Sequence, residues 1–134
     1  MTAEPARHRV LVVEDSDAIR MAFTILLEES GYHVDAAATG AEGVRMAAER
    51  APDLVLLDLG LPDIPGVEVA RRIKSAPGTS RVPVVALTGR DDDADREALH
   101  AAGCTAYLVK PVDTQALIRA LPGYIENARA VAES

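Results

Sequence analysis

Five short apolar runs recur along this chain, and they constrain its fold more than any other feature. They occupy residues 10–13, 33–37, 54–57, 82–87 and 106–109. Each is short and rich in β-branched residues or leucine, as expected of strands that are buried on both faces of a sheet. The stretches between and after them have the apolar spacing of helices, at about 17–31, 41–50, 67–75, 92–102 and 113–121. This alternation predicts an α/β fold in which helices cover both faces of a parallel sheet.

Charge and composition exclude several classes of protein. The chain has 21 acidic and 14 basic residues, so its net charge is −7. A chain this acidic is repelled by phosphate backbones and anionic lipids, so we expect neither nucleic acid nor a membrane as a partner. Cys104 is the single cysteine, which excludes an internal disulfide. The sequence also lacks an apolar stretch long enough for a membrane span or a signal peptide, and we expect a cytoplasmic protein.

Polar residues stand at the ends of four of the five apolar runs. Glu14 and Asp15 follow the first run, Asp58 the third, Thr88 the fourth and Lys110 the fifth. Ligands of an open parallel sheet bind beyond the carboxyl ends of its strands. The sequence therefore predicts that these side chains gather at one edge of the sheet.

The three carboxylates expected at this edge indicate a metal site. Glu14, Asp15 and Asp58 together carry a charge of −3, and Lys110 carries +1. The remaining charge of −2 would be neutralised by one Mg²⁺. Like charges this close raise one another's pKa unless a cation lies between them. A hard divalent ion prefers oxygen ligands, and carboxylates supply them.

These residues and their order resemble the receiver domain of two-component response regulators. The matching features are Glu14-Asp15, Asp58 with Gly66 eight residues later, Thr88, and Tyr107-Leu-Val-Lys110-Pro111. Each motif is weak alone, but together and in this order they form a specific signal. The resemblance implies a flavodoxin-like, doubly wound sheet with strand order 2-1-3-4-5 and five helices. It also divides the chain into a flexible N-terminus at 1–7, the receiver domain at 8–121 and a helical segment or tail at 122–134.

The resemblance further implies a role for each residue of the site. Asp58 would accept a phosphoryl group from a phosphohistidine on a histidine kinase or a histidine phosphotransfer protein. The Mg²⁺ ligands would be Glu14, Asp15, Asp58 and the carbonyl group of Gly60. Lys110 would pair with one phosphoryl oxygen, and the hydroxyl group of Thr88 would donate a hydrogen bond to another. The Lys110–Pro111 peptide bond would be cis.

Thr88 and Tyr107 are the switch residues that the resemblance implies. Phosphorylation changes the charge on Asp58 from −1 to about −2, and in the family the threonine moves toward the phosphate while the aromatic residue turns inward. This movement alters the face made by the fourth helix, fifth strand and fifth helix, which we expect to be the output surface. Too few residues follow 121 for an output module. We therefore expect either that the signal passes by contact to a downstream protein target, or that the chain is part of a larger protein with a tethered output domain. A homodimer is left open.

Three other functions are compatible with this fold class. A Mg²⁺-dependent phosphatase with an aspartate nucleophile needs a second acid two residues after Asp58, but Gly60 stands there. A flavin-binding module needs a phosphate loop after the first strand, where acidic residues repel phosphate. A phosphate-independent adaptor is disfavoured by the intact site residues. We therefore expect a phosphoacceptor regulatory domain and not an enzyme acting on other substrates.

Three residues depart from the usual pattern. Pro122, followed by glycine, predicts a break or sharp kink in the last helix near residue 121, because proline removes a helical hydrogen bond and clashes with the preceding turn. Gly60 offers no side chain to orient a water that attacks the phosphoryl group. Arg90 would add a positive charge beside that group.

Overall fold

Strands and helices alternate along the chain, as the apolar runs predict. The computed structural model describes residues 8–89 and 92–133, so the expected flexible segment 1–7 and Arg90 lie outside the described residues. Within the described residues, the elements in chain order are β1 (Arg9–Val13), α1 (Asp17–Glu29), β2 (His33–Ala37), α2 (Gly40–Arg50), β3 (Leu54–Asp58), α3 (Gly66–Ser75), β4 (Val84–Thr88), α4 (Asp93–Ala101), β5 (Ala106–Val109) and α5 (Thr114–Glu133). All neighbouring strands pair in parallel in the order β2-β1-β3-β4-β5. The predicted doubly wound, flavodoxin-like fold is confirmed.

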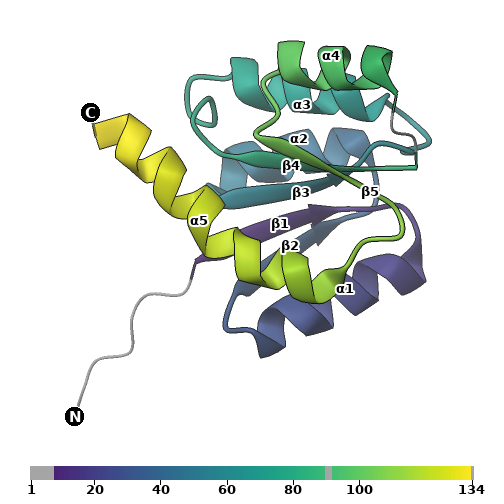
Figure 1. Cartoon of the computed structure of the whole chain (residues 1–134), viewed down its shortest axis with the longest axis vertical. Coiled ribbons are helices and arrows are strands. Elements are labelled where there is room, and N and C mark those ends of the chain that lie inside the picture. Colours follow the sequence, from purple (N-terminus) through teal and green to yellow (C-terminus); the bar gives the residue numbers. More distant parts are fainter. Residues whose placement is uncertain (1–7, 90–91, 134) are drawn as a thin grey trace.

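Helices cover both faces of the sheet (Figure 1). α1 and α5 lie on one face, and α2, α3 and α4 lie on the other. In β1, Val10 and Val12 belong to the buried cluster that includes apolar residues of α1 and α5. The alternate residues Leu11 and Val13 belong to the cluster that includes apolar residues of α2 and α3. Because successive strand side chains point to opposite faces, a strand covered on both faces is apolar at every position.

The register of the sheet brings the carboxyl ends of the strands to one edge. Val13 pairs with Leu57, and Asp58, the next residue of β3, pairs with Leu87 of β4. Thr88 pairs with the last residue of β5. The residues that follow β1 and β5 therefore meet those that end β3 and β4.

α5 passes through Pro122 as one helix. Its assigned span is Thr114–Glu133 with Pro122 inside it, so the expected break into a separate segment is wrong. Leu117, Leu121 and Ile125 are spaced four residues apart and are 2%, 0% and 1% exposed. They hold the helix in the core on both sides of the proline, and this packing outweighs the hydrogen bond that proline cannot donate. A kink at Pro122 stays a prediction.

Two smaller results complete the fold. β4 begins at Val84, two residues later than the apolar run suggested, because Pro83 has no N–H group to donate to the sheet. In the part of the chain that the structure describes, none of the helices is long and apolar enough to cross a membrane.

Candidate functional site

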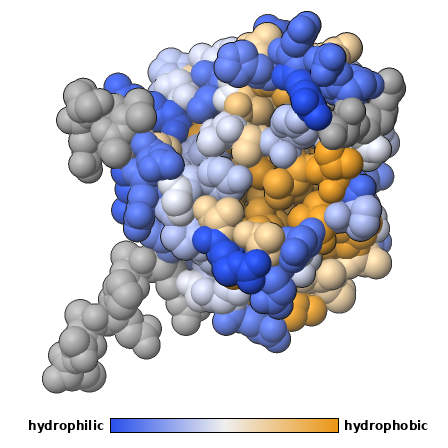
Figure 2. All heavy atoms as spheres, viewed as in Figure 1, coloured by the Kyte–Doolittle hydropathy of each residue, from blue (hydrophilic) through white to orange (hydrophobic). Residues whose placement is uncertain are grey.

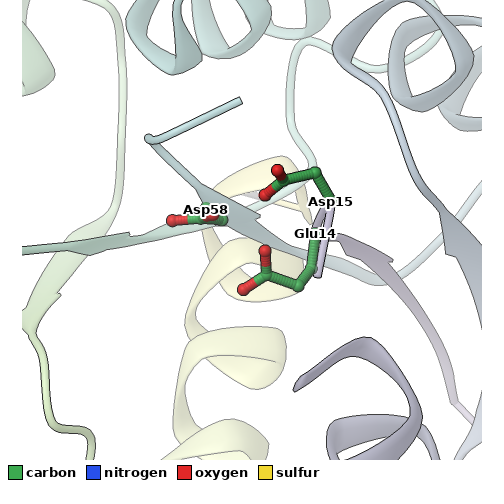
Figure 3. Close-up of side chains that lie close together, drawn as sticks. All are labelled: Glu14, Asp15 and Asp58. Atoms are coloured by element: carbon green, nitrogen blue, oxygen red, sulfur yellow. The ribbon is translucent and has the colours of Figure 1, made fainter. Parts of the chain in front are cut away.

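Three carboxyl groups from two strand ends lie together at the carboxyl edge of the sheet. Glu14 and Asp15 follow β1, and Asp58 is the last residue of β3. One carboxylate oxygen from each residue lies within 4.8 Å of the others. Figure 3 shows the three groups turned toward the same region. The structure therefore brings together the acidic residues that the sequence placed at this edge.

Glu14 is the member of the cluster with an unsatisfied oxygen. Its side chain is buried, and Oε2 accepts a hydrogen bond of 3.2 Å from the backbone N–H of Ser16. Oε1 is buried without a hydrogen-bond partner in the described residues. Burial raises the pKa of Glu14 to about 7, and the neighbouring Asp58 carboxyl adds to the increase. A buried acceptor left unpaired costs about 1–3 kcal/mol, and a cation between the carboxylates would remove that cost. The residues present therefore fit a hard divalent cation.

Asp58 is held ionised by groups on its other side. Nζ of Lys110 donates to Oδ1 of Asp58 at 2.7 Å, and the backbone N–H of Gly60 donates to the same oxygen at 3.3 Å. Burial alone would raise the pKa of Asp58, but the hydrogen bonds from Lys110 and Gly60 oppose this effect, and the pKa of Asp58 lies below its ordinary value. An ionised carboxylate at neutral pH is the form that can act as a nucleophile.

The strand framework fixes the position of Lys110. Its backbone N–H donates to the carbonyl oxygen of Thr88 at 2.7 Å, which extends the pairing of β4 and β5 by one residue. The Lys110–Pro111 peptide bond is cis. The backbone of Lys110 therefore lies at the carboxyl edge of the sheet, where the acidic cluster also lies.

The two expected switch residues lie at different distances from this edge. Thr88 is buried at the end of β4, one residue beyond the partner of Asp58. Tyr107 is half-buried within β5, where it pairs with Ala86. The guanidinium carbon of Arg96 in α4 lies 5.7 Å from the centre of the Tyr107 ring. Thr88 thus borders the site, whereas Tyr107 lies farther back along the sheet, next to α4.

Two glycines shape the segment after Asp58. A Cβ added to Gly60 would lie 3.8 Å from both carboxylate oxygens of Asp58, which is ordinary contact distance. A Cβ added to Gly66 would lie 2.5 Å from Cα of Leu59. α3 therefore begins in close contact with the backbone beside Asp58, and only glycine permits this approach.

Two residues that support the site were missed by sequence reasoning. Arg20 in α1 donates to the carbonyl oxygen of Glu14 at 2.9 Å. A cation this near a helix N-terminus opposes the helix dipole, and this was the available signal. Asp63 accepts hydrogen bonds from the N–H groups of Gly40 and Ala41 at 2.8 and 3.0 Å, which ties the segment after Asp58 to the start of α2. The local sequence around Asp63 carries no signal for a partner so far along the chain.

The comparisons with known proteins agree with this geometry. The family model for the response regulator receiver domain matches residues 10–122. The chain belongs to this family. Receiver domains are regulatory domains of two-component systems, so the resemblance noted in the sequence is confirmed.

Curated relatives of this receiver domain differ in length. It is 42% identical over 108 residues to the transcriptional regulatory protein AfsQ1 of Streptomyces coelicolor, covering 81% of this chain and 47% of the relative. It is 34% identical over 119 residues to the polar-differentiation response regulator DivK of Brucella ovis, covering 89% of this chain and 97% of the relative. The chain therefore spans about half the length of the first relative and nearly all of the second.

A solved structure with the same fold contains a bound metal ion. It is the receiver domain of the sensor histidine kinase PA1611 from Pseudomonas aeruginosa, with a magnesium ion coordinated in its active site cleft. It superimposes with a TM-score of 0.82 at 34% identity, covering 90% of this chain and 99% of that one. The acidic cluster of the present receiver domain can be compared directly with such a site.

Proposed function

We propose that this receiver domain is a phosphorylation-dependent signalling switch and that Asp58 is its phosphoacceptor. The observation that carries the proposal is the position of Asp58, between the carboxyl groups of Glu14 and Asp15 and the ammonium group of Lys110. The phosphodonor is a phosphohistidine on a histidine kinase or a histidine phosphotransfer protein. The phosphatase alternative lacks the second acid it needs, because Gly60 stands at that position. A phosphate-independent adaptor gives no reason for this combination of acids and lysine.

The reaction transfers one phosphoryl group between two proteins. A carboxylate oxygen of Asp58 attacks the phosphorus atom, the P–N bond to the donor histidine breaks, and the electron pair stays on the imidazole nitrogen. Such transfers depend mainly on positioning and on neutralising the charge of the phosphoryl oxygens. Nζ of Lys110 supplies one positive charge at Asp58. Thr88 ends β4 at the same edge, and its hydroxyl would donate to another phosphoryl oxygen.

The proposed cofactor is Mg²⁺, held by Glu14, Asp15, Asp58 and the carbonyl group of Gly60. When bound, it neutralises the negative charge that the phosphoryl group brings to the cluster. The unpartnered, buried Oε1 of Glu14 supports this assignment. So does the donor set, which consists of oxygen atoms only and suits Mg²⁺ better than a softer metal.

The proposed output surface is formed by α4, β5 and α5, with Thr88 and Tyr107 as the residues that couple it to Asp58. A groove of about 390 Å³ is lined by residues of β5, of α5 and of the segment between them. Val109, one of the lining residues, is 37% exposed. Figure 2 shows an apolar patch on the side of the molecule where Figure 1 places β5. An exposed apolar patch of this kind is typical of a protein interaction site. Its partner would be a downstream protein or a tethered output domain.

Phosphorylation by a small-molecule donor tests the proposal. The wild type, Asp58→Ala and Asp93→Ala are incubated with Mg²⁺ and acetyl phosphate, and their intact masses are measured. Asp93 is an exposed acid in the first turn of α4 and serves as the matched control. We expect the wild type and the control to gain one phosphoryl group, and Asp58→Ala to gain none. EDTA should abolish the gain. Equal labelling of Asp58→Ala and the wild type would show that the phosphoacceptor is wrong.

A further inference from the structure

We propose that Arg20 is a positioning residue for the acidic pair Glu14-Asp15. This inference rests on the proposed function, because it concerns how the chain holds its cation ligands. Arg20 lies in α1. Its hydrogen bonds within the described residues go to two backbone carbonyl groups and to Asp17, not to the three carboxylates of the cluster. Arg20 would act on the backbone of Glu14 and Asp15, which carry two of these carboxylates.

The guanidinium group of Arg20 binds three acceptors, two in the segment between β1 and α1 and one on the first residue of α1. Nη1 donates to the carbonyl oxygen of Glu14 at 2.9 Å and to that of Asp15 at 3.4 Å. Nη2 donates to the carboxylate of Asp17 at 2.5 Å. The Arg20 side chain is only 22% exposed. A planar group with several fixed N–H donors can hold these acceptors together, whereas a lysine ammonium group cannot reproduce that fork.

These contacts complete a frame around Glu14. Its backbone N–H donates to the carbonyl oxygen of Ala37 in β2 at 3.0 Å, and its own carbonyl oxygen is held by Arg20. The next peptide group, that of Asp15, is held by the same guanidinium. The orientation of a side chain follows the orientation of its backbone, so Arg20 helps to fix the directions in which both carboxylates point. The carboxylate of Asp17 in turn holds the guanidinium.

Charge alone does not account for an arginine at this place. A positive group beside a cation site repels the cation. The same group near the N-terminus of α1 is opposed by the helix dipole. Replacing Arg20 with a neutral residue would therefore strengthen Mg²⁺ binding if its charge were its main effect. It would weaken Mg²⁺ binding if its main effect were to position the ligands.

This difference in sign allows a direct test. Mg²⁺ is titrated by calorimetry into the wild type, Arg20→Gln, Arg20→Lys and Arg45→Gln. Arg45 pairs with Glu49 on the exposed surface of α2, so its replacement removes the same charge without touching the β1–α1 segment. Residues that orient metal ligands typically contribute about 10–100-fold in metal affinity. We expect the Kd for Mg²⁺ to rise by about that factor in both Arg20 variants and to stay unchanged in Arg45→Gln.

The conservative variant and the folding control separate positioning from general destabilisation. Arg20→Lys keeps the charge, so a weaker affinity in this variant cannot come from a lost charge. Urea unfolding in EDTA measures the stability of each variant, and the backbone amide signals of residues 14–17 in NMR spectra report local rearrangement. Unchanged or tighter Mg²⁺ binding in Arg20→Gln, with the protein folded, would overturn the inference and leave the proposed function intact. Absence of Mg²⁺ binding in the wild type would overturn both.

Discussion

Lys110 and Asp58 form a direct contact between the residue after β5 and the last residue of β3, with 2.7 Å between Nζ and Oδ1. Asp58 is almost fully buried, whereas Lys110 is partly exposed. The contact offsets the effect of burial on the Asp58 carboxylate and keeps it ionised. It also places a positive charge at the carboxylate that would receive the phosphoryl group.

Replacing Lys110 with methionine should raise the pKa of Asp58, because burial then acts without its main opposing hydrogen bond. The pKa is measured from the carboxyl ¹³C signal as pH is varied in EDTA. The rate of phosphorylation by acetyl phosphate should fall by about 10²–10³-fold, the usual effect of removing a donor that stabilises developing negative charge. Lys74→Met is the matched control, since Nζ of Lys74 donates to the carbonyl oxygen of Val82 instead. An unchanged Asp58 pKa in Lys110→Met would contradict the assigned role.

Glu14 should make the metal-free protein less stable as pH rises. Its pKa is about 7 when folded and 4.5 at its ordinary value, so the folded state binds this proton more tightly than the unfolded state. The resulting stabilisation is full below about pH 4.5, declines as pH rises, and is lost above about pH 7. Relative to the wild type, Glu14→Gln should therefore be more stable at pH 8 than at pH 5, as measured by urea unfolding in EDTA.

Mg²⁺ provides the control for this pH effect. A bound cation favours the ionised carboxylate of Glu14 and stabilises the folded state at pH 8. Adding Mg²⁺ at pH 8 should raise the free energy of unfolding of the wild type more than that of Glu14→Gln. An equal pH dependence of stability in the two proteins would mean that Glu14 titrates normally.

Pro122 should lower the stability of α5 although it does not interrupt the helix. The side chain is exposed, so its removal leaves the core intact. Pro122→Ala restores one possible hydrogen bond and relieves the clash with the preceding turn, and we expect a gain of about 1–3 kcal/mol in the free energy of unfolding. Gly123→Ala is the neighbouring control, because a Cβ there meets no described atom within 4 Å, and it should add about 1 kcal/mol. Reduced stability in Pro122→Ala would indicate that proline is favoured at this position.

The sequence was sufficient to predict the strands and the acidic cluster because both depend on local patterns. Each apolar run marks a strand, buried in β1, β3 and β4 and partly exposed in the edge strands β2 and β5. Parallel pairing brings the strand ends to one edge. Asp58 and Glu14 could therefore be placed together although they lie far apart in the chain. The predicted break at Pro122 was wrong, because burial of Leu121 and Ile125 outweighs the cost of a proline in the helix. This burial is seen only in the packed structure.

Two contacts between side chains and backbone groups were not predicted from the sequence. Asp63 could be assigned to a turn from its neighbours, but its two hydrogen bonds to the start of α2 depend on how the helices pack. Arg20 stands out only as a cation near the N-terminus of a helix, and this signal does not name its partner. Its contact with the Glu14 carbonyl is seen only in the folded chain.

Gly66 should tolerate no side chain, because α3 packs against the segment that follows Asp58. In Gly66→Ala the new Cβ would lie 2.5 Å from Cα of Leu59 and 3.2 Å from the carbonyl oxygen of Asp58. The backbone must move, and overpacking of this kind costs about 1–3 kcal/mol. The free energy of unfolding should fall by that amount, and the affinity for Mg²⁺ should fall with it. Gly78→Ala is the control, since its Cβ meets no described atom within 4 Å, and it should change stability by less than about 0.5 kcal/mol.

Gly60 should leave hydrolysis of the Asp58 phosphate unassisted. The residue is exposed, and a Cβ added there would lie 3.8 Å from both carboxylate oxygens of Asp58, so a longer side chain has room beside the phosphoryl group. In Gly60→Asn, the amide group can hold a water molecule near the phosphorus atom, which shortens the life of the acyl phosphate. Phosphoryl loss from purified protein is followed by intact mass after the donor is removed. Gly60→Ala is the control, because its side chain fills the same space but cannot orient water. An equal lifetime in the wild type and Gly60→Asn would show that this position does not control hydrolysis.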